Sequence, residues 1–290
     1  MTSPECEVDL YALEGDRAFL FCHLKDARLA KDDGFVRKLA DQVPGGGVVA
    51  IGRALKVENR SEPLAPLWLE EAPLDGALWA VEGTLFLRLE TTAVLNPGLF
   101  LDQRENRAAL VERVRIALES GPAPVLNLFS FTGSFSLAAR SGGTQKTTSV
   151  DVSPRYLAWE KKSYERNFSG EEAPRLLKGD ARDFLRRAKN RGDKFRFVVL
   201  DPPTFSRADR KVFRAAEHLP ALVEDAIACL DEAPGSAVFV SSNDAGWDES
   251  AFLDGFGELA RRSSLALERG SVPADFGPTH ALRCAWLVRR

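Results

Sequence analysis

Four polar segments in the second half of the chain follow apolar, strand-like runs, and their residue types suit a single ligand. The first is the small-residue turn 129–134, in which Gly133 would let the backbone approach a ligand closely while helix-terminal N–H groups face it. The second is Asp151, placed at the spacing at which an acidic residue accepts hydrogen bonds from both hydroxyls of a ribose.

The third and fourth segments extend the same pattern. Asp180, within Gly179-Asp180-Ala181, is a hydrogen-bond acceptor suited to an adenine amino group. Asp201-Pro202-Pro203-Thr204-Phe205 predicts a rigid turn whose fixed backbone presents carbonyl groups and an aromatic face to a planar ring. Together the segments predict a nucleoside-binding site.

Each segment also has a simpler structural explanation. Thr132-Gly133-Ser134 could merely begin a helix, and Asp151 and Asp180 could each be helix N-caps. Two prolines directly after a buried apolar strand are harder to explain by structure alone. A complete G-x-G-x-x-G is absent, so the sequence supports a dinucleotide pyrophosphate site poorly.

The elements that must position these residues alternate between helices and short apolar strands from about residue 104. The expected strands are Val125–Leu128, Thr147–Asp151, Arg175–Leu177, Phe197–Leu200 and Ser236–Val240, with a terminal pair at 265–268 and 281–288. The expected helices cover 106–118, 134–140, 154–167, 181–190 and 217–230, and a long loop follows the fourth strand. This alternation predicts a parallel sheet covered on both faces, with ligands beyond the carboxyl ends of its strands.

The first 95 residues predict a smaller α+β domain. Its expected elements are strands at 8–12, 18–24 and 48–57, a helix capped by Asp33 that runs to Val43, and a hairpin at 78–82 and 85–90. Pro63, Pro66 and Pro73 are expected to break regular structure. The predicted fold is therefore α/β, with a small domain over 1–95 and a Rossmann-like domain over 96–290.

Composition excludes several classes of protein. The chain of 290 residues has a net charge of −3, no apolar run long enough to span a bilayer, and no signal-like start. Its four cysteines (Cys6, Cys22, Cys229, Cys284) are scattered and its three histidines lie far apart, so we expect reduced thiols, no metal site and a cytoplasmic location. The acidic balance counts mildly against nucleic acid as a partner.

Several segments together resemble one family. Val125–Ser134, Thr148–Ser153, Lys178–Asp180 and Leu200–Ser206 resemble class I methyltransferases that modify bacterial large-subunit ribosomal RNA. Asn96–Arg104 resembles the Gly-Leu-Phe-Leu-Asp-x-Arg segment that precedes the catalytic domain in those enzymes. The resemblance covers roughly residues 95 to 245 and returns at Asp275-Phe276 and at 284–287.

The resemblance implies S-adenosylmethionine as the cofactor. The residues then expected to bind it are Gln103, Arg104, Asn127, Phe129, Phe131, Thr132, Gly133, Asp151, Asp180 and Asp201. Gln103 and Arg104 would lie near the methionine end of the cofactor.

Two branches of the resembled family differ in chemistry. One methylates cytosine C5 and needs a cysteine nucleophile just after the fifth strand, where this chain has Ser241-Ser242-Asn243. A serine hydroxyl is a far weaker nucleophile than a thiolate. The other branch forms N7-methylguanine and has Ser-Asn-Asn at this place, which the present sequence fits better.

Guanine N7 carries an in-plane lone pair and no proton, so its methylation requires positioning and exposure of the base instead of a nucleophile. The expected catalytic group is Asp201, Pro202, Pro203, Phe205 and Asn243. Asp201 and the two prolines would position the ring, Phe205 would stack on it, and Asn243 would bond its edge. Asp201 would also stabilise the cationic product.

Two clusters of basic residues could bind RNA. The first comprises Arg182, Arg186, Arg187, Lys189, Arg191, Lys194 and Arg196 and is expected to be a solvated helix face. The second follows the Asp201 turn and comprises Arg207, Arg210, Lys211 and Arg214. It is as consistent with a loop that binds phosphates as with one that does not. The expected partner is RNA, with large-subunit ribosomal RNA favoured, and the sequence carries no signal for oligomeric state.

The resembled enzymes usually carry an additional RNA-binding module, and we expect none before the small N-terminal domain of the sequence given. Three alternatives therefore stay open: methylation of a small molecule or another RNA base, a non-catalytic RNA-binding or assembly protein, and a nicotinamide dehydrogenase. The dehydrogenase explains Asp151 and the parallel sheet but leaves the Asp201 turn unexplained.

Overall fold

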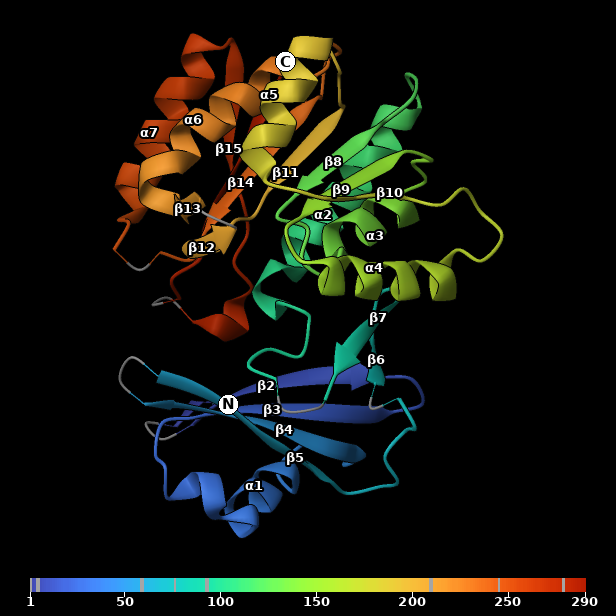
Figure 1. The fold of residues 1–290 in the computed structure, drawn as a ribbon, viewed down its shortest axis with the longest axis vertical. Helices are drawn as coiled ribbons and strands as arrows, with labels where there is room; N and C mark the ends of the chain where they lie inside the picture. Colours follow the sequence, from blue (N-terminus) through green and yellow to red (C-terminus); the bar gives the residue numbers. More distant parts are fainter. Residues whose placement is uncertain are drawn as a thin grey trace. The chain divides into compact units, whose positions relative to one another are not determined.

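The computed structural model describes residues 2–3, 6–57, 60–75, 77–91, 94–208, 211–244, 246–277 and 280–290, and for 2–3, 57, 60, 205–208 and 211–212 it describes the backbone alone. The chain forms two compact units, Met1–Leu101 and Asp102–Arg290 (Figure 1). Among the described helices, none is long and apolar enough to cross a membrane.

The first unit is built on one sheet with the strand order β5-β4-β3-β2-β6-β7, and β1 pairs with β2. Its elements are β1 (Thr2–Ser3), β2 (Cys6–Leu13), β3 (Arg17–Leu24), η1 (Leu29–Lys31), α1 (Asp33–Ala40), β4 (Val48–Val57), β5 (Arg60–Trp68), β6 (Ala77–Glu82) and β7 (Leu85–Glu90). Val36 and Ala40 of α1 pack on Leu20 and Ile51 of the sheet.

Two predictions for this unit are wrong in detail. Helix α1 is capped by Asp32, whose side chain accepts a hydrogen bond from the Phe35 N–H, and the helix ends at Ala40 instead of Val43. Pro63 and Pro66 do not break regular structure, because both lie in β5. This strand is at the edge of the sheet, where a residue without an N–H is tolerated.

The second unit contains a seven-stranded sheet with the order β10-β9-β8-β11-β14-β16-β15. Its strands are β8 (Val125–Leu128), β9 (Thr147–Asp151), β10 (Arg175–Lys178), β11 (Phe197–Leu200), β14 (Ala237–Ser242), β15 (Leu265–Arg269) and β16 (Arg283–Arg289). Strands β10, β9, β8, β11 and β14 are parallel, and β16 runs antiparallel to both β14 and β15. The predicted parallel sheet and the terminal strand pair are confirmed.

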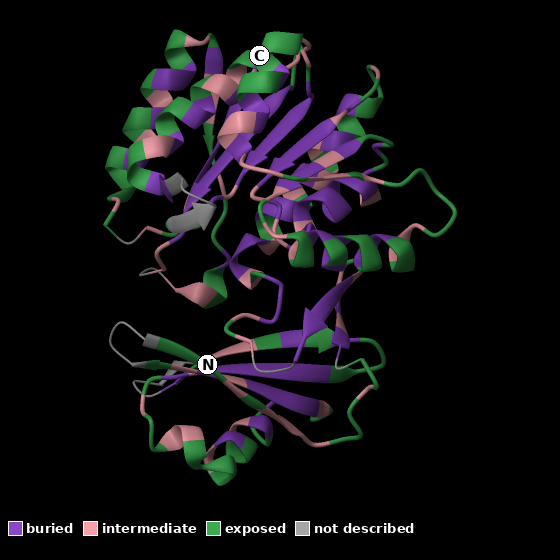
Figure 2. Cartoon of the chain, viewed as in Figure 1, coloured by how far each residue is buried: buried purple, intermediate pink, exposed green. Residues whose placement is uncertain are grey.

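Helices cover both faces of this sheet, α2, α3 and α4 on one side and α5, α6 and α7 on the other (Figure 1). Their bounds are η2 (Leu101–Gln103), α2 (Arg104–Leu118), α3 (Ser134–Ser141), α4 (Pro154–Asn167), α5 (Ala181–Arg191), α6 (Ala215–Ala228), α7 (Glu249–Arg262) and η3 (Ala274–Phe276). In β11, Phe197 and Val199 pack in one core, whereas Val198 and Leu200 pack in the other. Burial on both faces explains why this strand is apolar throughout (Figure 2).

The connection after β11 differs from the prediction. Instead of a long loop, the backbone forms a hairpin of β12 (Phe205–Ala208) and β13 (Lys211–Arg214), which leads directly into α6. Helix α7 also has no counterpart in the sequence prediction.

Strand order reverses between β8 and β11, which lie side by side in parallel. The connections from these two strands therefore leave on opposite faces, and sheets of this kind bind ligands beyond the carboxyl ends of the strands at such a point. The turns after β8, β9 and β11 are those singled out in the sequence.

Candidate active site

The turn after β8 has an unusual backbone. Phe129 and Phe131 have φ angles of +57° and +51°, and Gly133 has +79°. Left-handed backbone is uncommon for bulky residues and persists only where neighbouring structure holds it. Here the Phe131 N–H donates to Asp151 Oδ2 (2.9 Å) and the Ser130 N–H donates to the Val150 carbonyl (3.2 Å), so the end of β9 holds the turn in place.

Asp151 is fixed by backbone donors from both sides. Its Oδ1 accepts a hydrogen bond from the Ser153 N–H at 2.8 Å, in addition to the bond from Phe131. Ser153, and not Asp151, caps α4, since its side chain accepts from the Tyr156 N–H. Partial burial raises the pKa of Asp151 against these stabilising bonds. The N-cap explanation of Asp151 is therefore wrong, and its carboxylate is held in one orientation at a strand end.

Aromatic side chains flank the turn. Phe131 packs edge-on against Tyr156 with ring centroids 4.3 Å apart, and Phe129 packs against Phe213 at 5.0 Å. Thr132, between Phe131 and Gly133, is buried. Phe129 and Phe131, both partly exposed, give the strand ends an apolar border suited to a flat ring system.

Gly133 is required for a reason that the sequence does not reveal. A Cβ at this position would lie 2.2 Å from the Glu160 side chain, so the close neighbour of the glycine is a buried carboxyl group of α4. Burial raises the pKa of Glu160 to about 7, while nearby serine hydroxyls oppose the shift. Gly133 begins α3 without a side-chain cap, as expected of a helix entry.

A buried chain of hydrogen bonds supports the turn from below. Asn127 donates to Ser136 Oγ (2.9 Å), the Ser136 hydroxyl bonds Ser149 Oγ (2.7 Å), and Ser149 donates to Glu160 Oε1 (2.5 Å). Asn127 is only 2% exposed, so the structure places its amide beneath the turn, within the protein interior. The predicted ligand residue Asn127 thus contacts the supporting network.

Asp180 is the N-cap of α5. Its Oδ1 accepts from the backbone N–H groups of Arg182 and Asp183, and the Arg182 guanidinium bonds both carboxylate oxygens. This ion pair lowers the pKa of Asp180 against the opposing effect of burial. The capping explanation is confirmed for Asp180, and its position after β10 places it at the same edge of the sheet as Asp151.

The carboxylate after β11 is held differently. Asp201 Oδ1 accepts a hydrogen bond from Ser241 Oγ at 2.5 Å and another from Gln103 Nε2 at 3.0 Å. No donor among the described residues bonds Oδ2. Burial, together with the negative charge of Asp102, raises the pKa of Asp201 to about 6, whereas the two donors and Arg107 oppose the shift.

Gln103 belongs to a second buried network. Its Oε1 accepts from Asn106 Nδ2 (2.8 Å), and Asn106 in turn bonds both backbone groups of Ser271. Gln103 is 1% exposed, so the structure places it where it orients Asp201. Its neighbour Arg104 forms an ion pair with Asp275 and lies over the Phe276 ring at 5.9 Å.

The remaining predicted catalytic residues have different surroundings. Pro202 is buried, whereas Pro203 and Asn243 are exposed. Asn243 follows β14, the strand that carries Ser241 beside Asp201. Phe205 begins β12, and its side chain lies outside the described residues.

No cysteine of this chain is exposed, since all four are buried. Cys284 lies opposite Ser241 in the β14–β16 ladder, yet burial raises its pKa to about 12. Cys229 is also buried, and its pKa is raised. A thiolate nucleophile is therefore disfavoured at these positions.

Sequence reasoning missed Ser241, Glu160 and Asp102 as members of the site. Ser241 stood within the singled-out Ser241-Ser242-Asn243 segment, but only the strand register shows which serine faces Asp201. Asp102 bonds His280 through Oδ2 (2.9 Å), and its buried Oδ1 has no hydrogen-bond partner in the described part of the chain. The described residues contain no cluster of three or more His, Cys, Asp or Glu suited to a metal.

Known proteins share this architecture. A model of the S-adenosylmethionine-dependent methyltransferase family matches residues 18–255. Among solved structures, a candidate methyltransferase complexed with SAH is 22% identical, has a TM-score of 0.74, and is aligned over 99% of this chain and 76% of its own.

Two further structures are similar. The SAM-dependent methyltransferase from Agrobacterium tumefaciens is 18% identical with a TM-score of 0.70, covering 99% of this chain and 91% of its own. The tRNA m1G37 methyltransferase of M. jannaschii is 11% identical with a TM-score of 0.61, covering 99% and 76%. At these identities the solved structures show the class I methyltransferase fold.

The residues at the strand ends fit S-adenosylmethionine, the cofactor of the matched family. Asp151 presents a fixed carboxylate suited to ribose hydroxyls, and the Asp102 oxygen without a partner is an acceptor suited to an ammonium group. Phe131 and Tyr156 supply an apolar border for a purine. The family match over most of the chain, the sheet order and this donor and acceptor set agree: the chain belongs to the S-adenosylmethionine-dependent methyltransferases.

Proposed function

We propose that this methyltransferase acts on RNA and forms N7-methylguanine, with large-subunit ribosomal RNA as the favoured substrate. The main support for the proposal is the hydrogen bonding of the Asp201 carboxylate. One carboxylate oxygen is anchored by Ser241 and Gln103, whereas the other has no described protein donor. Such a group can stabilise a positive charge that develops on a neighbouring base.

The chemistry requires little beyond positioning. When bound, S-adenosylmethionine supplies a sulfonium methyl group. The N7 lone pair of guanine forms the new N–C bond as the C–S bond breaks, and the base gains the positive charge that sulfur loses. No proton has to be removed, so a nucleophile or base is unnecessary, in keeping with the four buried cysteines.

We assign the cofactor side of the site to the ends of β8, β9 and β10. Asp151 would bond the ribose, Asp180 would accept from the adenine amino group through the capacity left on its carboxylate, and the 129–133 turn would line the cofactor with its backbone. Asn127 and Gly133 would act indirectly, through the Ser136–Ser149–Glu160 network below the turn. Arg104 would bind the methionine carboxylate.

We assign the acceptor side to the ends of β11 and β14. Pro202 and Pro203 would fix the backbone around the base, Phe205 would stack on it, and the exposed Asn243 would bond its edge. Asp201, oriented by Gln103, would stabilise the methylated product. An RNA base must leave its stack to reach such a site, which favours a flipped or single-stranded guanosine.

A second candidate product is N1-methylguanine. The M. jannaschii neighbour is a tRNA m1G37 methyltransferase, and guanine N1 carries a proton that must leave. A carboxylate whose pKa is raised to about 6 is better able to accept that proton than an ordinary aspartate. The two candidates place the same residue, Asp201, in different roles.

The products distinguish the candidates. Purified protein would be incubated with S-adenosylmethionine and large-subunit ribosomal RNA or tRNA transcripts, and the digested nucleosides would be identified by mass spectrometry. We expect N7-methylguanosine in ribosomal RNA, lost with Asp201→Asn and retained with the exposed control Asp254→Asn on α7. N1-methylguanosine would support the second candidate, and 5-methylcytidine or an unmodified RNA would contradict both.

A further inference from the structure

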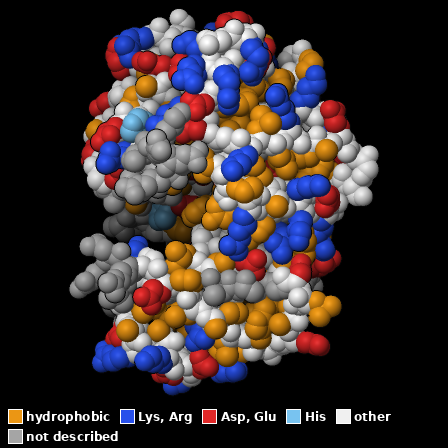
Figure 3. Space-filling view, viewed as in Figure 1, with side chains coloured by type: hydrophobic (Ala, Val, Ile, Leu, Met, Phe, Trp, Pro, Cys, Tyr) orange, Lys and Arg blue, Asp and Glu red, His pale blue; other side chains and the backbone are white. Residues whose placement is uncertain are grey.

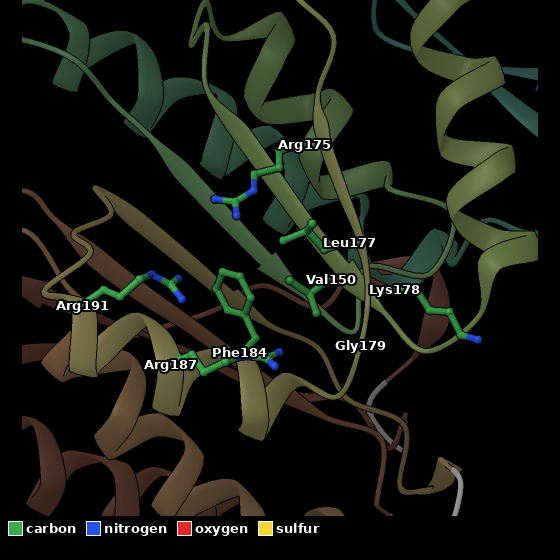
Figure 4. A pocket seen from close by; sticks show the side chains of 8 residues that line it. All are labelled: Val150, Arg175, Leu177, Lys178, Gly179, Phe184, Arg187 and Arg191. Carbon is green, nitrogen blue, oxygen red and sulfur yellow. The ribbon is translucent and has the colours of Figure 1, made fainter.

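A groove with a basic rim lies between the edge strand β10 and helix α5, outside the residues assigned above. Its volume is about 200 Å³. Val150, Leu177 and the buried Phe184 form its apolar wall, and Arg175, Arg187 and Arg191 line its rim (Figure 4). We propose that this groove binds the phosphate backbone of the RNA substrate, an inference that rests on the proposed function.

Most of the basic residues on and after α5 are neutralised locally. Arg186 pairs with Asp183, Lys189 with Asp225, Lys194 with Glu232 and Arg196 with Asp231. Arg182 is likewise committed to Asp180. On α5 the expected solvated helix face is thus a face of ion pairs, whereas for Arg196, which lies beyond the helix and is buried, that expectation is wrong.

Arg187 and Arg175 differ from the rest. Within the described part of the chain, neither guanidinium has a carboxylate within ion-pair distance, and both residues are exposed. They approach the groove from opposite walls, Arg187 from the helix and Arg175 from the strand. Two cations left unpaired on both sides of one groove are a feature of anion binding, because their charge is otherwise uncompensated.

Figure 4 shows the side chains that line the groove. The guanidinium groups of Arg175 and Arg191 extend toward one another past the Phe184 ring, whereas Lys178 points away. Arg191 also pairs with Asp193 at 2.5 Å, so its charge is partly offset. Lys and Arg side chains gather over α5 on the surface of the molecule (Figure 3).

The chemistry and size of the groove suit a backbone phosphate of RNA. Guanidinium groups bond phosphate oxygens in pairs, and a backbone phosphate is the anion that an RNA substrate offers. At about 200 Å³ the groove is smaller than sites that enclose a whole small-molecule ligand, which take roughly 300–1,000 Å³. It therefore suits a short piece of a longer chain, with the apolar wall in contact with sugar or base.

The position of the groove links it to the site. Gly179 lines the groove, and the next residue, Asp180, belongs to the proposed cofactor side. Arg175 begins β10 and Arg191 ends α5, so these arginines lie toward the other end of the groove, and an RNA strand that runs from them along α5 would approach the strand ends. Through these arginines the catalytic unit would hold RNA with its own surface.

The test compares two pairs of substitutions on one protein. Arg175→Gln/Arg187→Gln removes the two unpaired cations, and Arg186→Gln/Lys189→Gln removes the same charge from ion-paired positions of α5. Binding of a fluorescent large-subunit ribosomal RNA transcript would be measured by anisotropy over a range of salt concentrations, with S-adenosylmethionine affinity as the check on folding. We expect the first pair to weaken RNA binding about tenfold or more and to reduce the log–log salt slope by about two, with little change in the control pair.

Equal RNA affinity and salt slope in the two pairs would overturn the groove assignment. If the wild type then still methylates RNA, only the groove is wrong and the proposed function stands. A wild type that neither binds nor methylates RNA would overturn both, and nucleoside analysis of the same samples separates these outcomes.

Discussion

The ends of β9 and β11 each carry an aspartate, but the two carboxylates are held in different ways. Asp151 is bonded by backbone N–H groups of Phe131 and Ser153, which lie 20 and 2 residues away in the sequence. Asp201 is bonded by the side chains of Gln103 and Ser241, which lie 98 and 40 residues away. Backbone donors are part of the fold, whereas side-chain donors depend on two particular residues.

This difference matches the two tasks. A cofactor common to the family can be bound by a geometry that local backbone supplies. An acceptor-side carboxylate must be oriented and tuned, and side chains from distant segments allow both. We therefore expect substitutions at the end of β9 to affect cofactor affinity and those at the end of β11 to affect the chemical step.

The largest effect is expected for Asp201→Asn. The amide keeps an oxygen for Ser241 and Gln103 but removes the charge that stabilises the product. We expect kcat to fall about 100-fold or more, with the Kd of S-adenosylmethionine within about threefold of the wild type. Steady-state methylation of RNA measures the first quantity, and Asp254→Asn is the control. An unchanged kcat would remove Asp201 from the acceptor side.

Asp151→Ala is expected to have the next largest effect. It removes the acceptor for the ribose, the bond from the Phe131 N–H that fixes the 129–133 turn to β9, and the bond from the Ser153 N–H. We expect S-adenosylmethionine affinity to fall about 10- to 100-fold. At saturating cofactor, kcat should stay close to the wild-type value. A large loss of kcat with normal affinity would reverse the assignment of the two strand ends.

Ser241→Ala should act through the pKa of Asp201. The Ser241 hydroxyl stabilises the carboxylate, so its loss raises the pKa of Asp201 above about 6. Because the proposed N7 methylation uses the ionised form, we expect the acidic limb of the pH–rate profile to move upward by about one unit. The rate should fall several-fold near pH 6 and about twofold near pH 7, and it should recover at higher pH.

The neighbouring Ser242→Ala is the matched control for that profile. Ser242 is buried as well, but its hydroxyl accepts a bond from the Asp244 N–H and does not reach Asp201. Equal profiles for the two serine variants would show that Ser241 does not tune Asp201.

The smallest effect concerns the support below the cofactor turn. Burial raises the pKa of Glu160 from 4.5 in the unfolded chain to about 7, so the folded protein holds a proton that the unfolded chain releases between these values. Stability from this group is complete below about pH 4.5 and is lost as the pH rises through about 7, on the order of 3 kcal/mol in total. Glu160→Gln should abolish this loss.

Calorimetric Tm values at pH 5 and pH 8 measure the effect. We expect the wild type to lose several degrees more than Glu160→Gln over this interval. Glu165→Gln, an exposed position on the same helix, should behave as the wild type does. Parallel curves for Glu160→Gln and the wild type would show that the carboxyl titrates normally.

Much of the catalytic fold could be predicted because its signals are local. Apolar runs such as Phe197–Leu200 are buried on both faces, and the residues that follow them are placed by the rule for parallel sheets. The turn after β8, Asp151 and Asp201 lie at strand ends for this reason. The edge strand β5 and the β12–β13 hairpin escaped prediction because prolines and charged residues mask their strand pattern.

The parts of the site that could not be predicted depend on tertiary contacts. No spacing rule pairs Ser241 or Gln103 with Asp201, since those contacts arise from strand order and from the helix entry at 101–103. Asn127 points toward Ser136 because of its place in the alternation of β8, which the sequence leaves undetermined in a strand buried on both faces. The need for a glycine at position 133 likewise arises from the close approach of Glu160, a residue 27 positions further along.

The most direct test of the account is calorimetric titration of S-adenosylmethionine into the wild type, Asp151→Ala and Asp201→Asn. We predict tight binding by the wild type and by Asp201→Asn, and binding weakened about 10- to 100-fold by Asp151→Ala. Equal loss of affinity in both variants, or unchanged affinity in Asp151→Ala, would contradict the division of the site into a cofactor side at β9 and an acceptor side at β11.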